Sequence, residues 1–139
     1  MMDINKLELS DYQALAEFRY QIRRFLRFSE QKARSIGLEP QQYQLLLAVK
    51  GLPEDKRATV GELAERLQLQ HHSTVELIDR LVERNLVRRE RDEHDQRRVF
   101  VLLTQQGEEQ LHQLSQFALT ELRSTGPALV DALSVLIRT

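Results

Sequence analysis

Two adjacent histidines and a stretch rich in arginine are the residues with the clearest chemical potential in this sequence. Residues 80–98 contain seven arginines against five acidic residues (Arg80, Arg84, Arg88, Arg89, Arg91, Arg97 and Arg98). His71 and His72 are neighbours, and neighbouring side chains on a helix point about 100° apart, so they cannot easily share one metal ion. We therefore expect no metal site at this pair. The arginines alone identify no partner, because a run of charge is often simply a solvated surface.

Motifs of common catalytic sites are missing from the sequence. We find no glycine-rich phosphate loop, no nucleophile elbow and no His-Glu-x-x-His zinc helix. We therefore expect that the protein is not an enzyme and needs no cofactor. The complete absence of cysteine also excludes disulfides, thiolate metal sites and thiol redox chemistry.

Length and composition favour one folded domain in the cytoplasm. The chain has 139 residues, of which 41% are hydrophobic and 29% charged, and its net charge is −1. No apolar run approaches the roughly 20 residues of a transmembrane helix, and residues 1–18 do not resemble a secretory signal. We expect a soluble cytoplasmic protein without a membrane partner. The net charge gives no support to nucleic-acid binding, for which a basic domain is usual.

Long amphipathic helices are predicted at both ends of the chain. A capping box at Ser10 opens the first one, in which apolar residues recur every three or four positions until Gly37 ends it. Thr104 is placed to cap a second long helix, which Gly126-Pro127 should break before a last short helix. A long helix with a single apolar stripe usually packs on partner helices, often those of a second subunit.

Three shorter helices and a hairpin are predicted between these segments. Pro40 starts the first short helix, Thr59 caps the second, and a break at residues 68–70 leads to a third over residues 71–84. Asn85 can end that helix because asparagine tolerates the left-handed conformation. Two strands, residues 86–91 and 98–103, then flank the polar turn 92–96. The order predicts a mainly α fold with a small β-wing, a winged helix-turn-helix over about residues 40–103.

A hairpin with arginine near its tip, directly after a helix-turn-helix, favours DNA as the partner. The major groove admits one α-helix, and a basic hairpin beside that helix can reach phosphates or the adjacent minor groove. A narrow minor groove has an enhanced negative potential, which attracts an inserted arginine.

At these residues the sequence resembles the multiple-antibiotic-resistance regulator (MarR) family of winged helix-turn-helix transcriptional regulators. The resemblance is carried by several segments: Thr59–Leu67, Ser73–Val75, Leu77–Leu81, Leu86–Arg89, the wing Asp92–Arg98, and Leu102–Thr104 leading into Gly107. It implies a single domain over residues 1–139, with dimerisation helices at 1–37 and 105–139 and the DNA-binding region at 38–104. It also implies a homodimer whose two recognition helices enter successive major grooves of palindromic promoter DNA, about 34 Å apart. Such regulators are mostly repressors, and many release double-stranded DNA when a small phenolic or anionic effector binds.

The resemblance also assigns roles to individual residues. On the recognition helix we expect major-groove contacts from Gln70, His71, His72, Ser73, Glu76 and Arg80. Thr74, Ile78 and Leu81 should pack inward, whereas Val75 and Leu77 could either pack or touch a thymine methyl group. In the wing we expect Arg97 to reach the minor groove, Asp95 to hold its guanidinium, and Arg98 to contact phosphate. Glu76 departs from the family, in which arginine is common at this position, and this departure affects the expected sequence preference.

Basic residues on the first helix have two interpretations. Arg23, Arg24 and Arg27 could bind an anionic effector, or they could pair with Glu62, Glu65 or acids of the partner chain. The peroxide-sensing mechanism known within the family requires a cysteine, which this chain lacks. Two other functional classes remain open: a winged helix that binds only proteins, and a small-molecule carrier or enzyme without a recognised motif.

Overall fold

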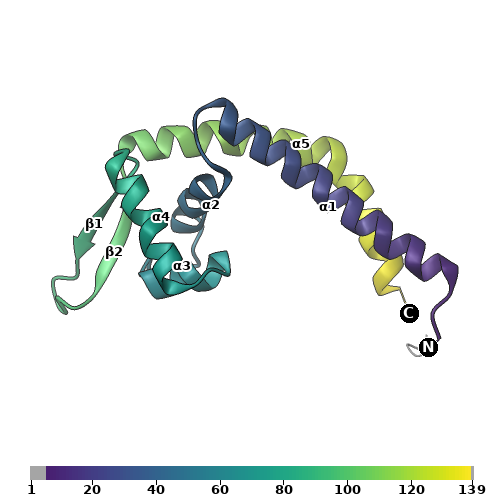
Figure 1. The fold of residues 1–139 in the computed structure, drawn as a ribbon, viewed down its shortest axis with the longest axis horizontal. Coiled ribbons are helices and arrows are strands. Elements are labelled where there is room, and N and C mark those ends of the chain that lie inside the picture. Colours follow the sequence, from purple (N-terminus) through teal and green to yellow (C-terminus); the bar gives the residue numbers. More distant parts are fainter. Residues whose placement is uncertain (1–5, 139) are drawn as a thin grey trace. The chain divides into compact units, whose positions relative to one another are not determined.

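The computed structural model describes residues 6–138 and is mainly helical, with one two-stranded sheet (Figure 1). Its elements are α1 (Leu9–Ser35), α2 (Pro40–Lys50), α3 (Val60–Leu67), α4 (His71–Glu83), β1 (Val87–Arg91), β2 (Val99–Leu103) and α5 (Gln105–Ile137). The chain forms two compact units. One unit is Ala33–Ser115, and the other comprises the chain up to Lys32 together with the segment from Gln116. The predicted mainly α fold with a small β-wing is confirmed.

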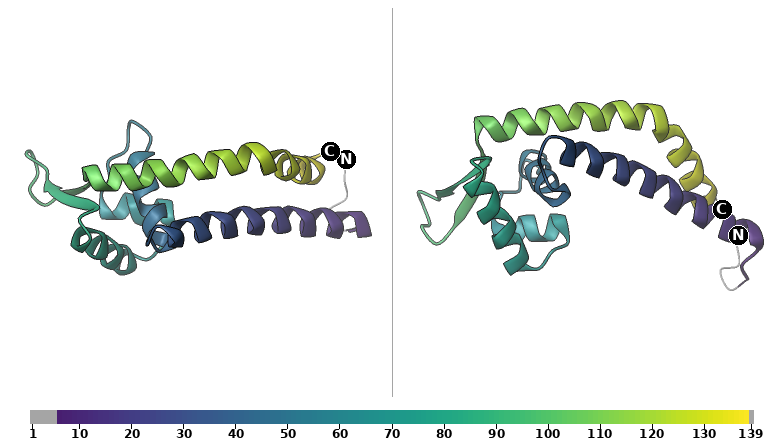
Figure 2. Two further views of the ribbon diagram at one scale, coloured as in Figure 1. Left: turned by 90° about the horizontal axis from the view of Figure 1, so that it is seen from above. Right: turned by 45° about the horizontal axis from the view of Figure 1, so that its top comes forward.

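Aliphatic side chains from every element form the core of unit Ala33–Ser115. The fully buried side chains include Leu38, Leu45, Leu46, Leu63, Ile78, Leu81, Leu86, Val87 and Val101. Helices α2, α3 and α4 each contribute to this core, and the sheet lies beside α4 (Figure 2). Burial of these side chains is the main force that holds α4 and the wing in one body.

Local capping residues fix the ends of the short helices. The Thr59 hydroxyl accepts a hydrogen bond from the Glu62 backbone N–H at 3.2 Å and so opens α3. Gln68 and Asn85 follow α3 and α4 with left-handed φ values of 54° and 58°. Gly37 follows α1 with a φ of 85°. The predicted start at Thr59 and the predicted stops at Asn85 and Gly37 are confirmed.

Antiparallel pairing of β1 with β2 forms the wing, with Val87 opposite Leu103 and Arg91 opposite Val99. Side chains alternate between the two faces of the sheet, so Arg89 lies on one face and Phe100 on the other. The edge of β2 is held from outside the hairpin, because the Val101 N–H donates to the Ala58 carbonyl at 2.9 Å.

Thr104 joins the end of α4 to the beginning of α5. Its hydroxyl donates to the Asn85 carbonyl at 2.7 Å and accepts from the Gly107 N–H at 3.0 Å. Its own N–H donates to the Leu86 carbonyl at 3.1 Å. Gly107 is needed at this crossing, because a Cβ there would lie 2.1 Å from the Leu86 carbonyl oxygen. The prediction that Thr104 caps this helix is confirmed.

The two predictions about the ends of the long helices need correction. Helix α1 begins at Leu9 instead of being capped by Ser10, and the Asp11 carboxylate accepts from the Glu8 N–H at 2.9 Å. Helix α5 continues through Pro127, so the predicted break at Gly126-Pro127 is wrong. Proline removes only one helical hydrogen bond, and the i→i−4 bonds on either side carry the helix onward as a bend instead of a stop.

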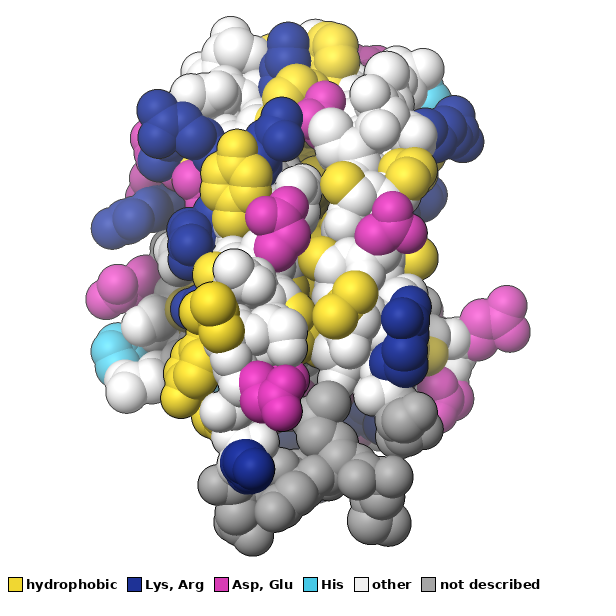
Figure 3. Space-filling view, turned by 90° about the vertical axis from the view of Figure 1, so that its right-hand side faces the viewer, with side chains coloured by type: hydrophobic (Ala, Val, Ile, Leu, Met, Phe, Trp, Pro, Cys, Tyr) yellow, Lys and Arg dark blue, Asp and Glu magenta, His cyan; other side chains and the backbone are white. Residues whose placement is uncertain are grey.

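Apolar side chains remain at the surface of the unit formed by α1 and the second part of α5. Ten of them are between 41% and 72% exposed: Leu9, Tyr12, Leu15, Tyr20 and Leu26 on α1, and Leu119, Val130, Leu133, Val135 and Ile137 on α5. Figure 3, which views the chain from the side of its termini, shows apolar side chains at this surface among charged ones. Within the same unit the Lys32 ammonium lies 4.7 Å from the centre of the Phe117 ring and so joins the two helices.

Candidate nucleic-acid interface

Helix α4 has one polar, exposed face and one packed face. Gln70, His71, His72, Glu76 and Arg80 are exposed and Ser73 is half-buried, so the predicted groove-contacting residues share the solvent side. Thr74, Ile78 and Leu81 are completely buried, as predicted. Leu77, which the sequence left ambiguous, is only 6% exposed and belongs to the core. Val75 is half-buried at the boundary between the two faces.

An ion pair between Asp79 and Arg89 connects α4 to the wing. The Arg89 guanidinium contacts the Asp79 carboxylate, although both side chains are partly exposed. The contact neutralises an acidic group next to the polar face of α4 and holds β1 beside the recognition helix. Sequence reasoning did not predict this pair, because its members belong to different elements and no local motif connects them.

The tip of the wing presents Arg97 to solvent. Its side chain is 93% exposed, and its Nε donates to Asp95 Oδ1 at 3.1 Å. The Arg97 backbone N–H donates to the same oxygen, also at 3.1 Å. Hydrogen bonds from the side chain and then the backbone of Arg97, aided by the charge of Arg98, lower the pKa of Asp95 below its usual value. The predicted pairing of Asp95 with Arg97 is confirmed.

Arg98 lies closer to the body of the hairpin. Its guanidinium is 5.4 Å from the centre of the Phe100 ring and 3.9 Å from the Asp92 carboxylate. The side chain is still half exposed, so its outer edge can face a phosphate. Asp92 itself is largely buried and accepts from the His94 N–H at 2.9 Å, which shapes the turn.

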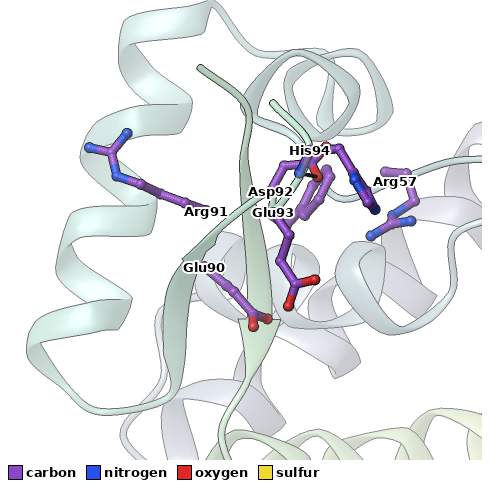
Figure 4. A pocket seen from close by; sticks show the side chains of 7 residues that line it. Arg57, Glu90, Arg91, Asp92, Glu93 and His94 are labelled. Atoms are coloured by element: carbon purple, nitrogen blue, oxygen red, sulfur yellow. Dashed lines mark hydrogen bonds between the residues drawn. The ribbon is translucent and has the colours of Figure 1, made fainter. Parts of the chain in front are cut away.

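A cavity of about 380 Å³ lies beside the wing, on the face opposite to Arg89. It is lined by Arg57, Glu90, Arg91, Asp92, Glu93, His94 and Phe100. In Figure 4 the Arg57 side chain is directed from its loop towards the hairpin, with His94 near it, whereas Arg91 points away to the other side. Arg57 lies 4.3 Å from the centre of the Phe100 ring. No pattern in the sequence indicates this contact, because a lone arginine in a loop has many possible partners.

The basic cluster of α1 lies on an exposed surface. Arg23, Arg24 and Arg27 are all solvent-exposed, and Arg24 lies 5.6 Å from the centre of the Tyr20 ring. Glu62, one of the acids considered as a partner for this cluster, pairs with Arg66 at 3.2 Å.

Comparison with known proteins relates this fold to one family. Residues 36–98 match the model of the MarR family, a segment that covers α2, α3, α4 and the hairpin up to Arg98. The helix-turn-helix and hairpin of this chain are similar to those of the MarR family. Comparison with curated protein sequences gave no match.

Solved structures of MarR proteins share the fold across most of their length. AbsC, a MarR family transcriptional regulator from Streptomyces coelicolor, is 22% identical with a TM-score of 0.76, over 96% of this chain and 93% of that chain. A MarR family protein from Bacillus stearothermophilus is 27% identical with a TM-score of 0.62, over 81% and 79%. A mutant MarR from E. coli, solved in complex with operator DNA, is 22% identical with a TM-score of 0.68, over 85% and 84%.

Residues 6–138 contain no candidate for a metal site or for a membrane-spanning helix. Among residues 6–138, no group of three or more histidine or acidic side chains is arranged to hold a metal ion. None of the helices in this part of the chain is long and apolar enough to cross a membrane.

Proposed function

We propose that this protein is a homodimeric transcriptional regulator of the MarR type that binds palindromic promoter DNA and acts as a repressor. The observation that carries the proposal is the pairing of an exposed polar face on α4 with an arginine at the tip of the adjacent wing. The α4 side chains suit base edges in a major groove, and Arg97 suits the neighbouring minor groove. A major-groove helix with a flanking basic hairpin reads DNA at two places at once.

Gln70, His71, His72, Ser73 and Arg80 are the proposed donors and acceptors for base edges. Glu76 shares their exposed face and brings a carboxylate, which repels phosphate but can accept from a cytosine amino group. We therefore propose that Glu76 sets part of the sequence preference. Arg97 and Arg98 of each wing supply positive charge, and Asp95 orients Arg97.

The exposed apolar residues of α1 and α5 support the homodimer. So many exposed apolar side chains on two helices favour a surface on which a partner packs. The ten residues given above lie on the two helices that the family resemblance assigns to dimerisation. Light scattering should therefore give twice the chain mass of 16.3 kDa.

The proposed function also includes control of DNA binding by an anionic or phenolic effector. It rests on Arg23, Arg24 and Arg27, three exposed guanidinium groups within little more than one turn of α1. Guanidinium groups bind carboxylates through paired hydrogen bonds. Salicylate, which is both phenolic and anionic, is a suitable first probe: it should weaken DNA binding by the wild type and have no effect on an Arg23→Ala, Arg24→Ala, Arg27→Ala variant.

Selection of DNA from a randomised duplex pool tests the proposed function. The wild-type protein should enrich an inverted repeat whose half-sites lie about 10 base pairs apart, centre to centre. Binding to the enriched duplex should weaken steeply with salt, because phosphate contacts release counterions. If no sequence is enriched and retention on duplex DNA is lost at moderate salt, the winged helix binds another kind of partner and the proposal is wrong.

A further inference from the structure

The Phe100 ring makes the side-chain contact that attaches the wing to the loop before α3. Phe100 is 8% exposed, and its ring lies 4.3 Å from the Arg57 guanidinium and 5.4 Å from that of Arg98. The next residue, Val101, donates its N–H to the carbonyl of Ala58, which follows Arg57 in the chain. One side-chain contact and one backbone hydrogen bond therefore join the same two segments.

The wing needs contacts of this kind because a two-stranded hairpin is only marginally stable by itself. On the face towards α4, the ion pair of Arg89 with Asp79 holds the wing. On the opposite face, within residues 6–138, the Arg57 guanidinium stacks on the Phe100 ring. The wing is thus held from both sides, by a contact with α4 on one face and by a contact with the loop before α3 on the other.

We propose that Arg57 is a positioning residue for DNA binding. Its guanidinium fixes the hairpin in the orientation in which Arg97 projects from the tip, and it does so without contacting DNA. This inference rests on the proposed function, because the orientation of the wing matters only if Arg97 enters a minor groove. Without the contact, the wing samples other orientations. The affinity for DNA then falls in proportion to the fraction of time that the wing spends in the binding orientation.

Hydrogen exchange on the DNA-free protein tests the first half of the inference. The reporter is the Val101 amide, whose hydrogen bond to the Ala58 carbonyl at 2.9 Å runs from the wing to the loop before α3. Arg57→Ala should speed its exchange about twofold to fivefold, the factor expected for loss of one exposed cation–π contact. Arg57→Lys should restore much of the protection, since an ammonium group can also lie over the ring. The matched control is Lys56→Ala, which removes a neighbouring positive charge and should leave exchange unchanged.

Fluorescence anisotropy with the duplex enriched by the wild type tests the second half. Because each dimer has two wings, Arg57→Ala should raise Kd by the square of the loss in the correctly oriented fraction of each wing, which is at most about 25-fold. The slope of log Kd against log salt should stay at the wild-type value. A slope lower by about 0.9 per subunit would mean that Arg57 contacts phosphate, and the inference would be overturned.

Failure of this inference and failure of the proposed function give different results. If the protein does not bind DNA, the wild type itself enriches no sequence. If Arg57 does not position the wing, the wild type binds and Arg57→Ala matches it in both exchange and affinity. Slower exchange at Val101 in Arg57→Ala would also overturn the inference.

Discussion

Replacement of Arg97 by alanine is the most direct perturbation of the proposed interface. The Arg97 side chain is 93% exposed and its guanidinium bonds Asp95 through Nε and Nη2, so its removal creates no cavity in the core. Loss of a specific arginine contact to DNA typically costs about 1–3 kcal/mol. Two subunits double this cost to about 2–6 kcal/mol, so Kd should rise about 30-fold or more.

Fluorescence anisotropy on the enriched duplex measures this effect, and two controls accompany it. Gln96→Ala changes an exposed neighbour in the same turn and should bind as the wild type does. Thermal unfolding and light scattering should show that Arg97→Ala keeps the fold and the oligomeric state. If Arg97→Ala binds the duplex with wild-type affinity, the wing does not contact DNA. The proposal that α4 and the hairpin both contact DNA is then refuted.

Three further perturbations test the packing and the wing turn. Leu77→Ala should lower the free energy of unfolding in urea by about 2–5 kcal/mol, because this side chain lies in the core; a loss below about 0.5 kcal/mol would place it on the surface instead. Gly107→Ala should destabilise strongly, since the new Cβ would lie 2.1 Å from a carbonyl oxygen, whereas Gly61→Ala meets nothing within 4 Å and should be neutral or stabilising by up to about 1 kcal/mol; equal effects of the two in urea unfolding would contradict the packing at the start of α5. The pKa of Asp95 is lowered in the folded protein, so its stabilising contribution is present above the unfolded-state pKa and is lost as the pH falls through the folded-state pKa. An NMR titration of the Asp95 carboxyl carbon should find this pKa raised towards its usual value in Arg97→Ala, and an unchanged pKa would show that Arg97 does not cause the shift.

Helix boundaries governed by single residues could be predicted from the sequence. Thr59, Gly37 and Asn85 act through their own backbone preferences or through a hydrogen bond to a residue three positions away. Such effects are local, so a sequence pattern is enough to locate them. The inward direction of Thr74, Ile78 and Leu81 followed in the same way from the helical period.

Features that depend on tertiary packing could not be predicted. Leu77 is not among them: it lies three residues after Thr74 and four before Leu81, a spacing that already places it on the buried face of α4. Proline at position 127 is locally a helix breaker, yet the long helix continues through it. The contacts of Arg57 with Phe100 and of Asp79 with Arg89 join segments distant in sequence or in different elements, and no residue spacing encodes them.

The junction at Thr104 has a mechanical consequence. With hydrogen bonds to Asn85, Leu86 and Gly107, this single residue ties the end of α4 to the first turn of α5, and the absence of a side chain at Gly107 lets the two backbones touch. Because the two backbones are in contact at this crossing, a rotation of the first turn of α5 must also move the end of α4. The first turn of α5 and the end of α4 therefore move together as one body.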